Sequence, residues 1–145
     1  MKLTSIEVPP WKQIEFPATF ESARQAEKQI LEASSAMGFG AADLFDIRMA
    51  LHEALVNAVK HGSHLDTAKR VHIGYRMDAA RLEVVIRDEG KGFDPGAIPD
   101  PTADENLAFP SGRGILLMRA SMDWVEFNPA GNAVTLRKSK RPASS

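Results

Sequence analysis

The sequence contains no cysteine among its 145 residues. This absence excludes disulfide bonds, thiolate catalysis and cysteine-ligated metal sites. The sequence also lacks any run approaching the roughly 18 consecutive apolar residues that a membrane-spanning helix requires. The segment from Met1 to Glu7 has no apolar run that resembles a signal peptide. We therefore expect a cytoplasmic protein with no membrane partner.

An excess of charge of either sign is absent as well. The 18 lysines and arginines nearly balance 19 acidic residues, which leaves a formal net charge of −1. A protein that wraps nucleic acid needs a clear basic excess, so we expect no direct nucleic-acid partner. The hydrophobic fraction of 43 % and the charged fraction of 26 % are ordinary for a soluble globular chain. A chain of this length predicts one domain around a single core.

The first half of the chain has the apolar spacing of one strand and two helices. Residues 12–16 alternate between polar and apolar, which predicts a short strand. Apolar residues then recur every three or four positions from Phe20 to Met37, and Gly38 follows them, as is typical of an amphipathic helix. A second helix is predicted from about Ala42 to about His61, with Gly62 as its stop.

The second half returns to strand spacing. Residues 71–77 and 82–86 alternate as two strands joined by a short turn. A short helix is predicted at 115–121, and residues 125–136 read as a closing hairpin. This order of elements predicts an α+β fold, a two-layer sandwich in which about three helices pack on one face of a mostly antiparallel, mixed sheet.

Three segments fit no regular element. Residues 94–112 contain several prolines and show no period, and loops this long in a compact domain usually serve a function, so we predict a lid there. Residues 1–10 predict an extra strand or a loose arm, and residues 139–145 predict a flexible tail. The domain itself is thus predicted to span residues 1–138.

A polar stripe runs along the second predicted helix. Glu53, Asn57 and His61 follow one another at i, i+4 and i+8, on the side away from that helix's apolar stripe. The ordinary interpretation is a solvated face. Met49 and Val56 lie on the same side, however, and an uncharged Asn within a helix is unfavourable without a partner. If this face is covered, Asn57 offers an amide oxygen suited to Mg²⁺, and Glu53 offers a carboxylate suited to general-base chemistry.

Asp88 ends the second of the two adjacent strands. Its parity along that strand predicts that the carboxylate points toward the helices, as the apolar side chains do. An unpaired buried carboxylate is costly, and the exocyclic amine of adenine is a suitable donor. The alternative is a turn-forming Asp before Gly90 and Gly92. A calcium loop is a poor alternative, because the further acidic ligands are missing from their places.

A Gly-x-Gly sequence, Gly112 and Gly114, opens the third predicted helix. Glycines here let the backbone approach an anion where free N–H groups and the helix dipole favour phosphate. Arg113 between them either reaches a phosphate or faces water. The chain has neither a P-loop sequence nor a complete Rossmann fingerprint, so a phosphate site here is of another kind.

These residues resemble the ATP-binding (Bergerat or GHKL) fold shared by gyrase, the heat-shock chaperone, histidine kinases and MutL. They look most like its small stand-alone branch, the anti-sigma-factor serine kinases of bacterial partner switching, over about residues 11–138. The family's three sequence boxes are matched by Glu53, Asn57, Ala58 and His61, by Asp88, Gly90, Gly92 and Phe93, and by Gly112, Gly114, Ile115 and Leu116.

The resemblance implies a role for each box. Glu53 is implied as the general base, Asn57 as the Mg²⁺ ligand and Asp88 as the residue that reads adenine. The implied cofactors are ATP and Mg²⁺. The other implied nucleotide-binding residues are His61, Gly90, Gly92, Phe93, Gly112, Arg113, Gly114 and Ile115. Some family members carry a basic residue just before the third box, and here Pro110 and Ser111 occupy that place.

The resemblance also implies a function. The chain would be an ATP-dependent serine/threonine kinase and anti-sigma factor that sequesters a sigma factor and phosphorylates an anti-anti-sigma protein of the STAS type. The alternative is a non-catalytic ATP-binding module that regulates through protein contacts. A clamp-type ATPase, a third interpretation, needs an additional transducer domain.

A homodimer is predicted through the N-terminal strand and the first helix. Trp11, Ile14 and Phe16 are the candidates for an exposed apolar patch there, and such patches often mark protein contacts. The alternative is that these three residues complete the core of the monomer.

Overall fold

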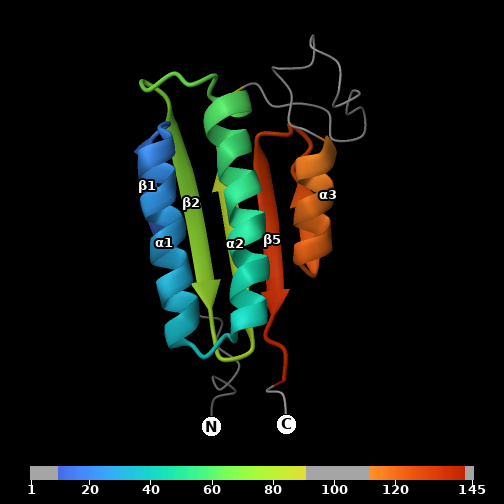
Figure 1. Ribbon diagram of the computed structural model, residues 1–145. Helices are drawn as coiled ribbons and strands as arrows, with labels where there is room; N and C mark the ends of the chain where they lie inside the picture. Colours follow the sequence, from blue (N-terminus) through green and yellow to red (C-terminus); the bar gives the residue numbers. More distant parts are fainter. Residues whose placement is uncertain (1–9, 91–111, 143–145) are drawn as a thin grey trace, which may run out of the picture.

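The computed structural model describes residues 10–90 and 112–142 (Figure 1). One five-stranded sheet, in the order β1-β2-β3-β5-β4, carries the helices on one face, with α2 between α1 and α3. The elements in chain order are β1 (Lys12–Pro17), α1 (Phe20–Ala36), α2 (Ala41–Val56), η2 (Asn57–Gly62), β2 (Arg70–Met77), β3 (Arg81–Arg87), α3 (Gly112–Ser121), β4 (Trp124–Phe127) and β5 (Ala133–Ser139). The α+β, two-layer prediction is confirmed, and every pairing among the described strands is antiparallel.

The face of the sheet toward the helices is built by the alternation that the sequence predicts. Ile73 of β2 lies opposite Ile86 of β3, and Tyr75 lies opposite Val84. All four side chains are at most 2 % exposed. Cross-strand pairs of branched and aromatic side chains stabilise a sheet, and here they also form the floor on which the helices pack.

Helix α1 begins and ends as its sequence predicts. Thr19 is its N-cap, since its side-chain oxygen accepts a hydrogen bond from the backbone N–H of Ser22 at 3.1 Å. Gly38 follows the helix with a φ of +92°, a conformation that favours glycine. Phe20 and Met37 were predicted as part of the buried stripe but are exposed, because only the middle of the helix faces the core. The side chains that α1 buries are Ala23, Ala26, Ile30 and Ser34.

The second helix is not α-helical to its end. The α-helix α2 stops at Val56 and continues as one π-helical turn, η2, in which the backbone bonds span five residues rather than four. The N–H of Ser63, for example, donates to the carbonyl oxygen of Ala58 at 2.9 Å. The prediction of a single helix to His61 is therefore corrected: the wider turn rotates the residues after Val56 relative to the α-helical stripe.

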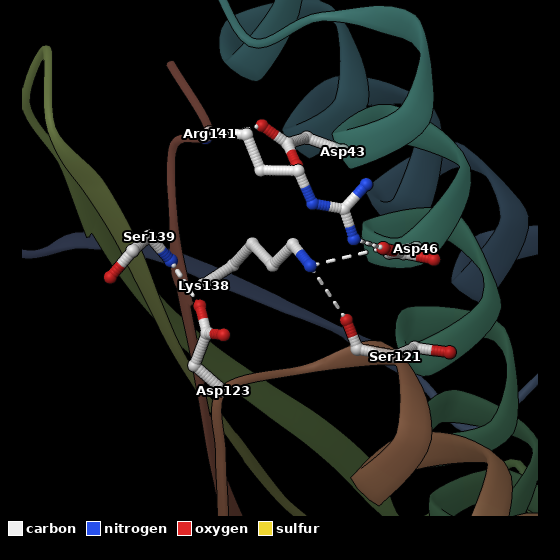
Figure 2. A network of polar contacts seen from close by, with 7 residues as sticks. All are labelled: Asp43, Asp46, Ser121, Asp123, Lys138, Ser139 and Arg141. Carbon is white, nitrogen blue, oxygen red and sulfur yellow. Dashed lines mark hydrogen bonds and ion pairs between the residues drawn. The ribbon is translucent and has the colours of Figure 1, made fainter.

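The end of the chain is anchored further than predicted (Figure 2). Lys138 of β5, only 3 % exposed, donates to Asp46 Oδ2 at 3.0 Å and to the carbonyl oxygen of Ser121 at 2.9 Å. The backbone N–H of Arg141 donates to Asp43 at 2.9 Å. The prediction of a flexible tail from residue 139 is thus wrong as far as Arg141. This network ties β5 and the end of α3 to α2, the three elements around the candidate site.

The N-terminal strand buries more of its apolar residues than predicted. Phe16 is 6 % exposed and belongs to the core, and Ile14 is half-buried against it. Both lie at inward-facing positions of β1, and this alternation applies to an edge strand as well. Trp11 is 37 % exposed, with the guanidinium of Arg76 4.2 Å from the centre of its ring. Of the predicted exposed patch, only Trp11 remains.

Some of the predictions fall outside the described residues. They are Gly92 and Phe93 of the second box, nearly all of the predicted lid, the arm at residues 1–9 and the tail at 143–145. In the described ranges, no helix is both long and apolar enough to cross a bilayer.

Candidate functional site

A cavity opens where the C-terminal end of the second helix meets the ends of β3 and the β4–β5 hairpin. Its polar lining comes from Asn57, His61, Asp88 and Asn132. Its apolar lining includes Ile86, Met118, Phe127 and Val134. A mostly apolar hollow with a few converging polar groups is typical of a small-molecule site.

Asp88 is the buried acid of this cavity. It is 8 % exposed, and it points to the helix side of the sheet, as its parity along β3 predicts. Burial raises the pKa of its carboxyl group above the ordinary value, although the hydrogen bond from the N–H of Gly90, 2.7 Å from Oδ1, acts the other way. Within the described residues no cationic side chain forms an ion pair with it. A donor that enters the cavity would therefore meet a carboxylate with unused accepting capacity.

Asn57 contributes a second group whose hydrogen-bonding capacity is not used. Its amide nitrogen Nδ2 is buried and has no hydrogen-bond partner among the described residues. A buried polar atom without a partner costs about 1–3 kcal/mol, so such atoms are few in folded proteins and call for an explanation. Since Asn57 and Asp88 line the same cavity, a bound ligand is the simplest explanation for both.

The structure brings only part of the predicted polar stripe to the cavity. Asn57 and His61 line it, and both belong to the π-helical turn. Glu53 lies one turn earlier in α2, is half-buried and is not part of the lining. Met49 and Val56 are also half-buried, so this side of the helix is not an open solvated face.

The third box lies at the start of α3, as predicted. Helix α3 begins at Gly112, and Gly114 is buried. Ile115 is 2 % exposed and belongs to the hydrophobic core, while Met118, one turn later, reaches the cavity. The side chain of Arg113 lies outside the described part of the structure.

The β4–β5 turn forms one wall of the cavity, and the sequence did not predict this. In the β4–β5 turn, Asn128 Oδ1 accepts hydrogen bonds from the N–H groups of Asn132 and Ala133, each at 3.0 Å. The carbonyl oxygen of Asn132 in turn accepts the N–H of Asp88 at 2.9 Å. The sequence identified the turn but contained no signal that placed it beside Asp88, which is distant in sequence.

The polar side chains of the cavity could hold a metal ion only together with oxygen atoms of a bound ligand. In the part of the chain that the structure describes, no group of three or more acidic, histidine or cysteine side chains is arranged so that it could hold a metal ion. Mg²⁺ in nucleotide sites is commonly held by one or two protein oxygens together with phosphate oxygens and water. A single amide such as Asn57 fits that arrangement and does not fit a cage made of protein alone.

Comparisons with known proteins agree with this geometry. The family described as the histidine kinase-like ATPase domain matches residues 16–138. The serine-protein kinase RsbW of Oceanobacillus iheyensis is 28 % identical over 122 residues, which cover 80 % of this chain and 77 % of that protein. RsbW of Bacillus subtilis is 32 % identical over 114 residues, covering 72 % and 70 %. A crystal structure of the RsbU and RsbW domains of a Mycobacterium tuberculosis protein shares the fold, with a TM-score of 0.63 and 20 % identity over 92 % of this chain and 34 % of that chain.

Proposed function

The chain belongs to the histidine kinase-like ATPase domain family, with RsbW serine-protein kinases among its relatives, and on this basis we propose that it is an ATP-dependent serine/threonine protein kinase and anti-sigma factor. In this proposal it sequesters a sigma factor while its antagonist is absent. It phosphorylates that antagonist, an anti-anti-sigma protein of the STAS type, and so keeps it inactive. It acts as a homodimer in the cytoplasm.

The main observation in support of nucleotide binding is the cavity that both Asp88 and Asn57 line. Asp88 presents a buried carboxylate, and no side chain of the described residues forms an ion pair with it. The exocyclic amine of adenine is a donor of the right kind for it, and the apolar lining suits the faces of a purine ring. Asn57 lines the same cavity; its side-chain oxygen would be the ligand for Mg²⁺, and its unpaired Nδ2 is a donor that a phosphate oxygen would satisfy.

The bound cofactor would supply the chemistry that the protein lacks: ATP brings the terminal phosphoryl group, and Mg²⁺ neutralises charge on its oxygens. The protein's own residues then position and deprotonate. The start of α3, at Gly112 and Gly114, is where the phosphates would lie, because the N-terminal end of a helix favours anions. Glu53 lies one helical turn before Asn57 and would take the proton from the acceptor hydroxyl.

The partners in the proposal rest on the family. The relatives named above are serine-protein kinases, and the resemblance to partner-switching anti-sigma kinases supplies the sigma factor and the STAS-type antagonist. A non-catalytic ATP-binding module with the same partners would need the same cavity. Phosphoryl transfer is what separates the two.

The test is transfer of radiolabelled phosphate from ATP to a purified STAS-type protein encoded by the same organism. We expect magnesium-dependent labelling of a serine or threonine, and no labelling when chelator is present. Labelling of the antagonist must also fall in the Asp88→Asn variant at ATP concentrations near the wild-type Kd. ATP binding without any transfer would reject the kinase and leave the regulatory module, and absence of ATP binding would reject both.

A further inference from the structure

Gly62 ends the π-helical turn, and its sequence position suggests only a helix stop. Stop glycines are usually needed because their backbone adopts a positive φ. Among the described residues the glycines with positive φ are Gly38 and Gly131, and Gly62 is not one of them. Backbone conformation therefore does not explain why this position carries glycine.

Space explains it instead. A Cβ atom added to Gly62 would lie 2.2 Å from Oδ2, 2.3 Å from Cγ and 2.6 Å from Oδ1 of Asp88. All three distances are far inside van der Waals contact, and all three atoms belong to the one carboxyl group. Any side chain at this position must move the carboxyl group or push the helix end away from β3.

Gly90, in the turn after β3, is also close to Asp88 and Gly62. A Cβ atom there would lie 2.0 Å from the carbonyl oxygen of Gly62 and 2.8 Å from Asp88 Oδ1. The N–H of Gly90 meanwhile donates to that oxygen at 2.7 Å. The carboxyl group is thus held between two glycine backbones, one from the end of η2 and one from the turn after β3.

The π-helical turn brings Gly62 to this place. In η2 the bonds span five residues, as in the bond from Ser63 N–H to Ala58. This turn accommodates one more residue than an α-helical turn and rotates those that follow it. His61 and Gly62 consequently both face the cavity that holds Asp88.

We infer that Gly62 is a positioning residue for nucleobase selection. Because it has no side chain, the helix end packs directly on Asp88 and fixes the carboxylate in the orientation from which it accepts a hydrogen bond from the exocyclic amine of adenine. The inference rests on the proposed ATP site. It adds that selection of adenine depends on a residue that has no side chain and acts through the orientation of Asp88.

The test compares the binding of ATP and purine riboside triphosphate to the wild type and to the full chain with Gly62→Ala. Purine riboside has a hydrogen where adenine has the amine, so the wild type is expected to prefer ATP. In the variant, ATP affinity should fall about ten- to a hundredfold, the equivalent of one hydrogen bond to a charged group. Affinity for purine riboside triphosphate should stay within about twofold, since its base has no donor for the Asp88 carboxylate. Gly40→Ala is the matched control, because nothing lies within 4 Å of a Cβ added there.

A double variant keeps the test decisive even if Gly62→Ala alone fails to fold. In Asp88→Ala the carboxyl group is gone, so adding Gly62→Ala should cost neither folding stability nor further ATP affinity. Additive losses in the double variant, equal losses for both nucleotides in Gly62→Ala, or unchanged ATP affinity there would each overturn the inference alone. A wild type that binds neither nucleotide would overturn the proposed function and this inference with it.

Discussion

Lys138 and Asp46 form a buried ion pair, with 3.0 Å between Nζ and Oδ2, that joins the last strand of the sheet to α2. The two partners are not equivalent. The side chain of Lys138 is 4 % exposed, and among residues 10–90 and 112–142 its ammonium has only the carbonyl oxygen of Ser121 as a partner besides Asp46. Asp46 is 20 % exposed and also pairs with Arg141. Replacing Asp46 should therefore affect stability differently from replacing Lys138.

We predict that Asp46→Ala destabilises the protein by about 3–5 kcal/mol, because it leaves a buried ammonium without its counter-charge. Lys138→Met should cost far less, since Met fills the same space without a charge and Asp46 keeps Arg141 as a partner. Urea denaturation measures both. Glu32→Ala, which breaks the exposed pair with Lys28, is the control and should change stability by less than about 0.5 kcal/mol. Equal losses for Asp46→Ala and Lys138→Met would contradict the asymmetry.

The buried carboxyl group of Asp88 predicts a conflict between stability and binding. Burial raises the pKa of Asp88 in the folded chain above its value in the unfolded chain. The protonated group therefore contributes its full stability at pH values below the unfolded-state pKa, and this stability is lost as the pH rises through the folded-state pKa. At neutral pH the ionised group costs stability that a neutral amide of the same shape avoids. Asp88→Asn should therefore raise the Tm of the ligand-free protein at pH 7 while weakening ATP binding about tenfold or more.

Thermal melts at several pH values check the sign of this effect. The increase in Tm caused by Asp88→Asn should become smaller as the pH falls through the raised pKa of Asp88. Asp78→Asn is a control of opposite sign, because hydrogen bonds from the N–H groups of Ala80 and Arg81 lower the pKa of Asp78. That variant should be less stable than the wild type at neutral pH, with the difference disappearing in acid. A gain in Asp88→Asn that is independent of pH would show that charge burial is not its cause.

Local sequence patterns were enough for most of the architecture. Alternation in β2 and β3 identified both strands and the face toward which Asp88 points, because side-chain direction in a strand has a fixed period. The start of α1 at Phe20 and the glycine after its end likewise depend on neighbouring residues only. Such features are determined within a few residues, so they can be predicted from a single sequence.

The candidate site was harder to predict because it depends on contacts between distant segments. The shift from α-helix to π-helix after Val56 has no apolar period of its own, so the i, i+4 spacing was extended to His61 as if the helix were regular. The contact of Gly62 with Asp88, and that of Asp88 with Asn132, join segments far apart in the sequence. Only the fold makes these residues neighbours.

The next prediction separates binding from chemistry. If Glu53 accepts the proton of the acceptor hydroxyl, Glu53→Gln should retain ATP binding and lose phosphoryl transfer by about 10²–10⁴-fold. Asn57→Ala should lose the effect of Mg²⁺ on ATP affinity as well as transfer. Glu126→Gln, at an exposed position of β4, is the matched control and should keep full activity. Transfer that is unchanged in Glu53→Gln would remove Glu53 from the role of general base.

The last prediction concerns the proposed homodimer, and the structure offers two matched tryptophans for it. Trp11 lies just before the edge strand β1 and Trp124 lies on the opposite edge strand β4. They are 37 % and 46 % exposed, and each ring contacts an arginine, Arg76 or Arg137. The two sites thus differ mainly in which edge of the sheet they occupy.

If the dimer uses β1 and α1, Trp11→Ala should weaken it and Trp124→Ala should not. Buried tryptophans at interfaces often contribute 2 kcal/mol or more, and the substitution removes one from each protomer, so the dimer dissociation constant should rise at least about thirtyfold in Trp11→Ala. Ile14→Glu is a poorer probe, because Ile14 packs against the monomer's core and a charge there would also disturb folding. Light scattering over a range of protein concentrations measures the change. Equal weakening by both substitutions would place the interface elsewhere, and a wild type that is monomeric at micromolar concentration would remove the homodimer from the proposal.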